Sequence, residues 1–188
     1  MPNLILASQS PRRRELLSIA GIRFTVRFRP VEELISDGER AKDYVRRLAR
    51  AKAEAAWEEA DEIVLGADTV VVLGESVLEK PADSADARAM LQALSGRTHV
   101  VVTGICFRHA AGSICDSAST RVRFVPLEDF EIDEYVASGE PMDKAGAYAI
   151  QGLASKFIDH IEGCYFNVMG LPLALVYRHL KALAASPG

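Results

Sequence analysis

The chain of 188 residues has few cysteines, few histidines and no long apolar run. Its three cysteines include no C-x-x-C pair, and an odd number of cysteines is a poor disulfide framework. We therefore expect reduced thiols; the alternative is a disulfide between Cys106 and Cys115, if these two face each other across a hairpin. The histidines show no metal-ligand spacing and are expected to be structural or surface residues: His99, His109, His160 and His179.

Signals for membrane insertion or secretion are also lacking. No apolar run approaches the ~18–20 residues that a membrane-spanning helix needs. The first apolar stretch, Leu4–Ala7, is too short for the core of a signal peptide, and charges follow it rather than precede it. Together with the cysteine content, this predicts a soluble cytoplasmic protein that does not enter a membrane.

The chain has no excess of positive charge, because its formal net charge is −4. Residues 1–60 contain 12 Lys and Arg against 9 Asp and Glu, whereas the rest of the chain contains 10 against 17. An acidic chain of this kind is a poor candidate for non-specific binding of nucleic acid. A small anionic ligand, held by a few local cations, fits the charge distribution better.

What the sequence does contain is an alternation of strand-like and helix-like segments. The expected strands are Asn3–Ala7, Arg23–Arg29, Glu62–Gly66, Thr69–Leu73, Thr98–Phe107, Ala118–Val125 and Lys156–Ile161. The expected helices are Pro11–Ala20, Arg40–Trp57, Ser84–Leu94, Glu128–Ala137 and Leu173–Ala184, with Ser10 and Ser84 as N-caps. This order predicts an α/β fold, as one domain over residues 1–188, with a mixed, partly antiparallel sheet flanked by helices.

Three arginines, Arg12 to Arg14, stand at the start of the first expected helix, where the helix dipole disfavours cations. Ser8 and Ser10 precede them and add hydroxyl groups to the free N–H groups of the helix N-terminus, which is a favourable place for an anion. Arg12 and Arg13 offer planar, bidentate donors suited to phosphate oxygens, whereas Arg14 is expected to face solvent. The alternative is that all of these arginines merely solvate the outer face of the helix.

Lys52 falls on the apolar stripe of the second expected helix, in step with Val45 and Leu48. A lysine inside such a stripe needs an anionic partner, unless it lies at the edge of the stripe and reaches water. Asp68 follows a buried strand, where open α/β sheets place their sites, and could hold Mg²⁺ or a nucleophilic water. The alternative for Asp68 is a turn residue that hydrogen-bonds to its own backbone.

Two further side chains lie in segments suited to ligand contact. Lys80 precedes Pro81, which favours an extended backbone from which the lysine could reach across a cleft. Gln151 lies in a glycine-containing loop, PMDKAGAYAIQG, and its carboxamide carries the donor and acceptor needed to read the edge of a base. For the downstream segments at Gly163 and Gly170, simple turns are the favoured interpretation.

Six stretches resemble, in order, the motifs of the Maf family: ASQSPRR (7–13), GADTVV (66–71), EKP (79–81), LSGRTHVVVTG (94–104), EPMDKAGAYAIQG (140–152) and YFNVMGLP (165–172). They span nearly the whole chain, so the match is highly specific. The resemblance implies an elongated α/β fold similar to that of the inosine-triphosphate pyrophosphatases. It also implies a metal-dependent nucleoside-triphosphate pyrophosphatase with a house-cleaning role. Phe166 departs from the tyrosine often found in relatives, and we expect little effect from it.

The reaction implied by this resemblance is hydrolysis of a nucleoside triphosphate to the monophosphate and pyrophosphate, with water attacking the α-phosphorus. The groups expected to bind or neutralise the triphosphate are Ser8, Ser10, Arg12, Arg13, Lys52 and Lys80. Glu33 and Asp68 are the acids expected to hold Mg²⁺ or Mn²⁺ and the water. Lys52, Asp68 and Lys80 are the expected catalytic residues, and Asp68 is either the proton acceptor or a metal ligand.

One branch of the family acts on dTTP and UTP, and another acts on 7-methyl-GTP. Arg12, Thr69 and Gln151 match the first branch, and Thr69 and Gln151 are expected to read a pyrimidine base, including that of modified nucleotides. The resemblance also implies a homodimer. An alternative function is that of a nucleotide-binding regulator of cell division, which would act at the septum without turnover.

Overall fold

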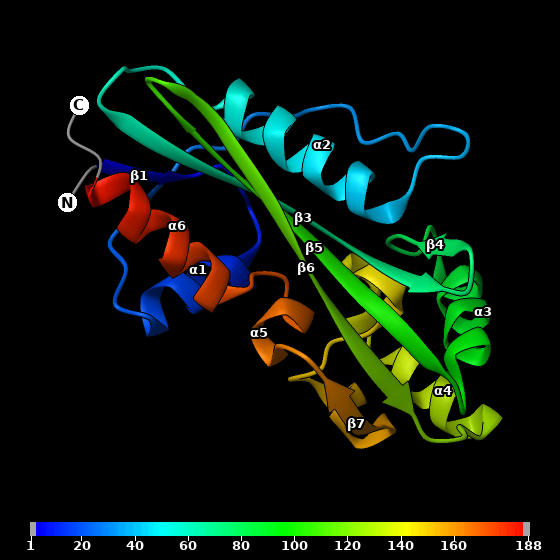
Figure 1. The fold of residues 1–188 in the computed structure, drawn as a ribbon. Coiled ribbons are helices and arrows are strands. Elements are labelled where there is room, and N and C mark those ends of the chain that lie inside the picture. Colours follow the sequence, from blue (N-terminus) through cyan, green and yellow to red (C-terminus); the bar gives the residue numbers. More distant parts are fainter. Residues whose placement is uncertain (1–2, 186–188) are drawn as a thin grey trace. The chain divides into compact units, whose positions relative to one another are not determined.

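The computed structural model describes residues 3–185, which have an α/β fold (Figure 1). The strands of its sheet are β1 (Asn3–Leu6), β2 (Thr25–Val26), β3 (Glu62–Leu73), β4 (Ser76–Leu78), β5 (Thr98–His109), β6 (Gly112–Phe124) and β7 (Ile158–Glu162). Their order is β2-β1-β3-β5-β6-β7, and β4 pairs with β3. β1 runs parallel to β2 and β3, whereas β4 and β7 run antiparallel to their partners. This confirms the predicted mixed sheet.

The helices are α1 (Pro11–Ile19), α2 (Ala41–Ala55), α3 (Ser84–Leu94), α4 (Asp129–Ala137), α5 (Tyr165–Val168) and α6 (Leu173–Ala185), with 3₁₀ helices η1 (Glu140–Asp143), η2 (Ala145–Ala147) and η3 (Leu153–Phe157). The longer helices lie close to their predicted positions. The short α5 and η1–η3 were not predicted, because a single turn has too few residues to show a helical period. Within residues 3–185, no helix is long and apolar enough to cross a membrane.

The chain divides into two compact units. The first comprises the residues up to Asp68, the segment Thr103–Ala118 and the residues from Gly170 onward. The second comprises Thr69–Val102 and Ser119–Met169. The single-domain organisation over residues 1–188 stays a prediction.

Three predicted strands are wrong in detail. β3 runs unbroken from Glu62 to Leu73, so Ala67 and Asp68 lie inside a strand instead of separating two strands. The predicted strand over 23–29 shrinks to Thr25–Val26, and both of these residues are exposed. Alternation of apolar and polar residues therefore did not mark a buried strand face there, because β2 is a short edge strand paired only with β1 among the described strands.

The predicted helix caps are also wrong in their chemistry. Ser10 occupies the N-cap of α1, but its side chain makes no capping hydrogen bond. At α3 the cap is Asp83, whose Oδ1 accepts a hydrogen bond from the Asp86 N–H (2.8 Å), and Ser84 is the first helical residue. Both serines thus lie within one residue of a helix start, but neither caps the helix through its hydroxyl group.

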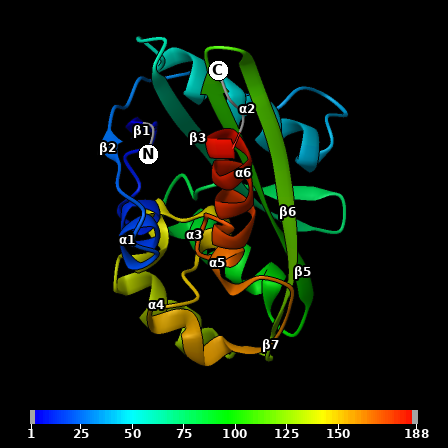
Figure 2. The same cartoon turned by 60° about the vertical axis from the view of Figure 1, so that its left-hand side comes forward.

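In the first unit, α2 and α6 pack on opposite faces of the strands (Figures 1 and 2). Glycines allow the α2 backbone to approach β3 and β5 closely. A Cβ atom at Gly66 would lie 2.8 Å from the Ala53 nitrogen, and one at Gly104 would lie 2.7 Å from the Arg46 nitrogen. Any larger residue at these positions must push α2 off the sheet, so these glycines set the position of the helix that carries Lys52.

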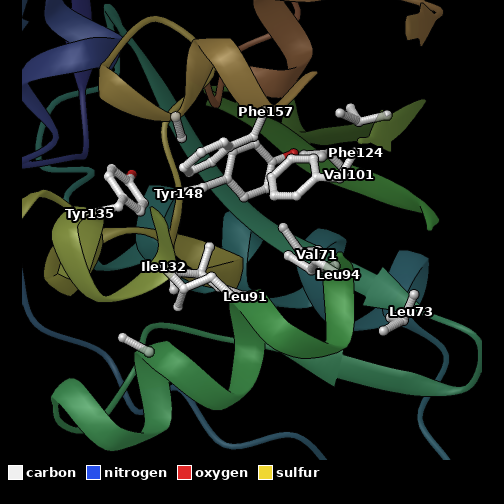
Figure 3. Packing of buried hydrophobic residues seen from close by; sticks show 14 residues of the cluster. Val71, Leu73, Leu91, Leu94, Val101, Phe124, Ile132, Tyr135, Tyr148 and Phe157 are labelled. Carbon is white, nitrogen blue, oxygen red and sulfur yellow. The ribbon is translucent and has the colours of Figure 1, made fainter. Parts of the chain in front are cut away.

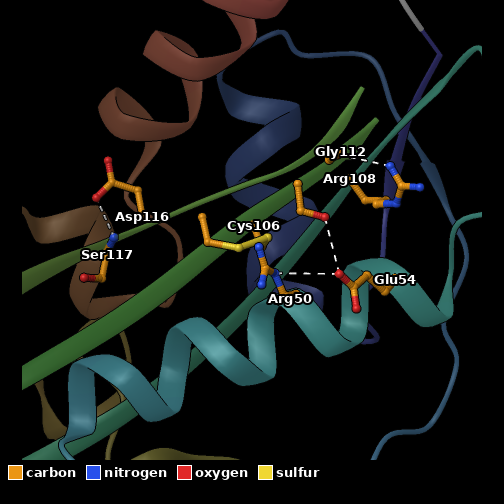
Figure 4. The surroundings of a disulfide bond; sticks show 9 residues. Arg50, Glu54, Cys106, Arg108, Gly112, Asp116 and Ser117 are labelled. Atoms are coloured by element: carbon orange, nitrogen blue, oxygen red, sulfur yellow. Dashed lines mark hydrogen bonds and ion pairs between the residues drawn. A yellow bond between two sulfur atoms is a disulfide. The ribbon is translucent and has the colours of Figure 1, made fainter. Parts of the chain in front are cut away.

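A disulfide joins Cys106 of β5 to Cys115 of β6, beside Arg50 and Glu54 of α2 (Figure 4). The prediction of reduced thiols is therefore wrong for these two cysteines. The β5–β6 hairpin is longer than predicted and places their Cα atoms 4.0 Å apart, directly opposite each other. Cys164 is a free cysteine.

The second unit has its own apolar core between α3, α4 and the strands (Figure 3). Leu91 of α3 and Ile132 of α4 are almost fully buried. Aromatic rings close the core, with Phe124 edge-on to Tyr148 at a centroid distance of 4.9 Å. Phe157 packs against the same Phe124 ring. Tyr148 belongs to the loop that leads to Gln151, so this core fixes the start of that loop.

Candidate active site

The first unit contains a buried ion pair. The ammonium Nζ of Lys52 is 2.7 Å from Asp68 Oδ1 and 2.8 Å from Glu33 Oε1. Lys52 and Asp68 are each only 7% exposed, whereas the Glu33 side chain remains 47% exposed. The prediction that Lys52 lies on the buried stripe and has an anionic partner is confirmed, and the alternative that it reaches water at the edge of the stripe is wrong.

The local folding explains why these charges meet. Gly66 of β3 faces α2, and side chains two residues apart on a strand point to the same face. Asp68 therefore also points toward α2. Lys52 is on the face of α2 that includes the buried Ala49 and Ala53. The strand period of about 2 residues and the helix period of about 3.6 residues thus place Asp68 and Lys52 on the faces by which β3 and α2 meet.

The surroundings of Asp68 change its acidity. Burial raises the pKa of the Asp68 carboxyl above its ordinary value, although the positive charges of Lys52 and Arg13 oppose that effect. A carboxylate with a raised pKa is a better proton acceptor than an exposed one. The aspartate is therefore suited to take a proton from a water molecule.

Arg13 anchors the loop between β1 and α1 beside this pair. Its Nε donates to the carbonyl oxygen of Gly170 (2.9 Å), and its Nη1 donates to that of Ala67 (2.9 Å). Nη1 also donates to Ser8 Oγ (3.2 Å). Burial lowers the pKa of Arg13, and the nearby Asp68 opposes this. The alternative that Arg13 merely solvates the helix surface is wrong.

The remaining residues of the predicted phosphate site differ in burial. Ser8 is buried, and its Oγ accepts a second hydrogen bond from the Ser10 N–H (3.2 Å). Arg12 is partly buried at the first turn of α1, whereas Arg14 is exposed, as predicted. The structure thus brings together Ser8, Arg13, Glu33, Lys52 and Asp68, with Ser10 beside them.

Three predicted site residues belong to the second unit. Thr69 follows Asp68 in β3 and is partly buried. Lys80 is exposed between β4 and α3. Gln151 is exposed between η2 and η3. Their roles in binding stay predictions.

The carboxylates of this site fit a hard divalent cation. Glu33 and Asp68 each present an oxygen to the same Lys52 ammonium, so the two carboxylates converge. Residues 3–185 contain no group of three or more His, Cys, Asp or Glu side chains that could hold a metal ion. Mg²⁺ characteristically takes one or two protein carboxylates and completes its shell with substrate phosphates and water. Two converging carboxylates are the protein part of such a ligand set.

The groups that accept hydrogen bonds from Arg13 could not be predicted from the sequence. Both are backbone carbonyl groups, of Ala67 and Gly170, and every residue type carries such a group. Gly170 lies in the segment YFNVMGLP, for which a simple turn was the favoured interpretation. A carbonyl 157 residues away from its arginine leaves no spacing signal.

Comparison with known proteins identifies the family of the chain. The family model described as Maf-like protein matches residues 3–183. A dTTP/UTP pyrophosphatase of Koribacter versatilis (strain Ellin345) is 51% identical over 179 residues, covering 95% of this chain and 93% of the relative. One of Geotalea uraniireducens (strain Rf4) is 51% identical over 186 residues, covering 97% and 96%. In fold, the chain is similar to the Staphylococcus aureus Ham1 protein, with a TM-score of 0.54, 15% identity and coverage of 96% and 98%. The chain belongs to the Maf family.

Proposed function

We propose that this protein hydrolyses dTTP and UTP, and modified pyrimidine nucleotides, to the monophosphate and pyrophosphate. The observation that carries the proposal is the buried Asp68 carboxylate, 2.7 Å from Lys52 and beside Arg13. A proton acceptor among cations is the arrangement that phosphoryl transfer from an anionic substrate needs. Relatives with about half of their residues identical to this chain carry the name dTTP/UTP pyrophosphatase.

In this mechanism Asp68 accepts a proton from water as the water oxygen bonds to the α-phosphorus. The bond between the α-phosphorus and the oxygen that bridges to the β-phosphorus breaks, and pyrophosphate leaves with its electron pair. Lys52 orients Asp68 in the free protein and neutralises phosphate charge in the complex. Arg12, Arg13 and Lys80 supply further positive charge, and Ser8 and Ser10 supply donors at the start of α1.

Glu33 and Asp68 are the residues that would hold Mg²⁺ or Mn²⁺. Such an ion, when bound, would neutralise phosphate charge and bring water and phosphate together. The role of the chain is then to aim both carboxylates at one place, which the shared contact with Lys52 achieves. Lys52 also limits the repulsion between the two carboxylates before a cation arrives.

Thr69 and Gln151 are proposed to read the base. Thymine and uracil present the O4 acceptor next to the N3–H donor, and one carboxamide offers a donor and an acceptor in matching order. A glutamate at position 151 would only accept hydrogen bonds, which suits the N1–H and N2–H₂ donors of guanine. Gln151 therefore favours pyrimidines on chemical grounds.

A nucleotide-binding regulator of cell division is the competing proposal, since it would explain the cations of the site equally well. It would not explain Asp68, because a carboxylate repels phosphate unless a cation lies between them. A cytoplasmic location stays a prediction from the composition of the chain, and a homodimer stays one from the family resemblance.

A nucleotide panel tests the proposed function. With Mg²⁺ or Mn²⁺, we expect the purified protein to release pyrophosphate from dTTP and UTP at least about tenfold faster, in kcat/KM, than from ATP or GTP, the factor that one extra hydrogen bond supplies. Pyrophosphate release is measured for standard and modified nucleotides, with and without EDTA. Binding of UTP without pyrophosphate release would favour the regulator. Equal rates on all bases would contradict base reading by Thr69 and Gln151.

A further inference from the structure

The loop that carries Gln151 is held on both sides by one pair of side chains within the second unit. The hydroxyl of Tyr135, in α4, donates a hydrogen bond to Glu140 Oε1 (3.0 Å) and accepts one from the Ala149 N–H (3.3 Å). Both carboxylate oxygens of Glu140 accept from the Leu153 N–H, at 3.0 and 3.1 Å. Gln151 therefore lies midway between two backbone groups that the Tyr135–Glu140 pair fixes.

This pair is built into the core. Tyr135 is 3% exposed, and its ring packs edge-on against Phe157 with centroids 5.6 Å apart (Figure 3). Burial raises the pKa of Tyr135, so its hydroxyl keeps the proton that it donates to Glu140. A Cβ atom at Gly152 would lie 2.6 Å from Glu140 Oε2. The carboxylate thus rests directly against the loop, and a larger residue at position 152 would have to displace it.

The chain before Gln151 is fixed as well. Tyr148 is buried, and its hydroxyl lies 2.7 Å from His99 Nε2. Burial lowers the pKa of His99 to about 4, so this histidine is neutral near pH 7, which agrees with its predicted structural role. Gly146 and Ala147 both have left-handed φ angles, of 68° and 60°. A left-handed alanine persists only where its surroundings determine the backbone.

We propose that Tyr135 and Glu140 are positioning residues for base selection, which hold the backbone on either side of Gln151 so that its carboxamide meets the pyrimidine edge in one orientation. The inference rests on the proposed function, because it requires that Gln151 reads the base. A long, exposed side chain discriminates between bases only if its backbone is fixed. A movable loop lets the same carboxamide adapt to the wrong base.

Two conservative substitutions test the proposal. Tyr135→Phe keeps the buried ring and removes the hydroxyl, and Glu140→Gln keeps the shape and removes the charge. We expect each to lower the selectivity for UTP over GTP, as the ratio of kcat/KM values, by about 3–10-fold, the range for one hydrogen bond. The loss should arise mainly from a higher KM for UTP. Tyr177→Phe, at a 56% exposed tyrosine of α6, is the matched control and should leave selectivity unchanged.

A double-mutant comparison separates positioning from general damage. Tyr135→Phe should lower the selectivity for UTP over GTP in the wild-type background. In a Gln151→Ala background it should leave the selectivity unchanged, because the loop then has no carboxamide to position. An equal loss in both backgrounds would overturn the proposal, and so would unchanged selectivity in both single variants.

Amide hydrogen exchange gives a readout that does not depend on activity. In both variants, exchange at residues 149–153 should become about tenfold faster, while the strands of the same unit keep their protection. Unchanged exchange in this segment would show that the Tyr135–Glu140 pair does not hold the loop, and would overturn the proposal. A different result would be faster exchange in the two variants together with a wild-type protein that hydrolyses no nucleotide. The proposed function and the base-selection role would then both be wrong, whereas the contact between the pair and the loop would be confirmed.

Discussion

Replacing Asp68 with asparagine is expected to lower kcat for UTP hydrolysis by about 10²–10⁴-fold, the usual contribution of a general base. The amide keeps the size of the side chain and one oxygen for Lys52, but it cannot accept a proton from water. Because the cations that we propose to bind phosphate remain, UTP should still bind with a Kd within about tenfold of the wild-type value. Stopped-time product assays and isothermal titration with UTP measure the two quantities separately.

The matched control for this substitution is Asp116→Asn. Asp116 is another aspartate of the first unit, and its carboxylate pairs with Arg178 and His179 of α6. This substitution should leave kcat near the wild-type value. Within the described residues, Asp116 makes no contact with Lys52 or Asp68. Normal turnover in Asp68→Asn would remove Asp68 from the chemistry. Loss of UTP binding together with turnover would instead make Asp68 a binding residue.

Replacing Gly104 with alanine is expected to lower the free energy of unfolding by about 3 kcal/mol, at the upper end of the usual cost of overpacking. The added Cβ atom would lie 2.7 Å from the Arg46 nitrogen, and a helix backbone cannot move aside as a flexible side chain can. The helix that must shift is α2, which carries Lys52, so kcat for UTP should fall too. Urea denaturation followed by circular dichroism measures the stability change.

Thr98→Ala is the control on the same strand. Thr98 is exposed at the start of β5, so its replacement should change the free energy of unfolding by no more than about 0.5 kcal/mol. If Gly104→Ala were as stable as this control, α2 would not be held against the sheet at the position described above.

Periodicity predicted the parts of the site that lie inside regular elements. Lys52 was recognisable because the helix period places it in step with Val45 and Leu48, and both of these residues are buried. For Asp68 the sequence indicated an ionic role but missed that the residue lies inside a strand. Ala67 and Asp68 were expected to separate two strands, whereas in the fold they continue one strand, and the lack of a side chain at Gly66 admits the backbone of α2.

Contacts across long sequence distances were not predictable in the same way. The acceptors of Arg13 are backbone carbonyls, and the disulfide between Cys106 and Cys115 depends on the register of a hairpin that was predicted too short. Glu140 begins a quoted motif, yet nothing in the sequence shows that its carboxylate accepts from Leu153. Register and loop conformation decide such contacts, and neither has a fixed period.

The most direct test of the central claim is hydrolysis of UTP in water enriched in oxygen-18, followed by mass spectrometry of both products. Attack of water on the α-phosphorus, with Asp68 as proton acceptor, predicts one heavy oxygen in UMP and none in pyrophosphate. The same label should appear at a rate that Asp68→Asn reduces. Label in pyrophosphate, or formation of UDP and phosphate, would contradict the account.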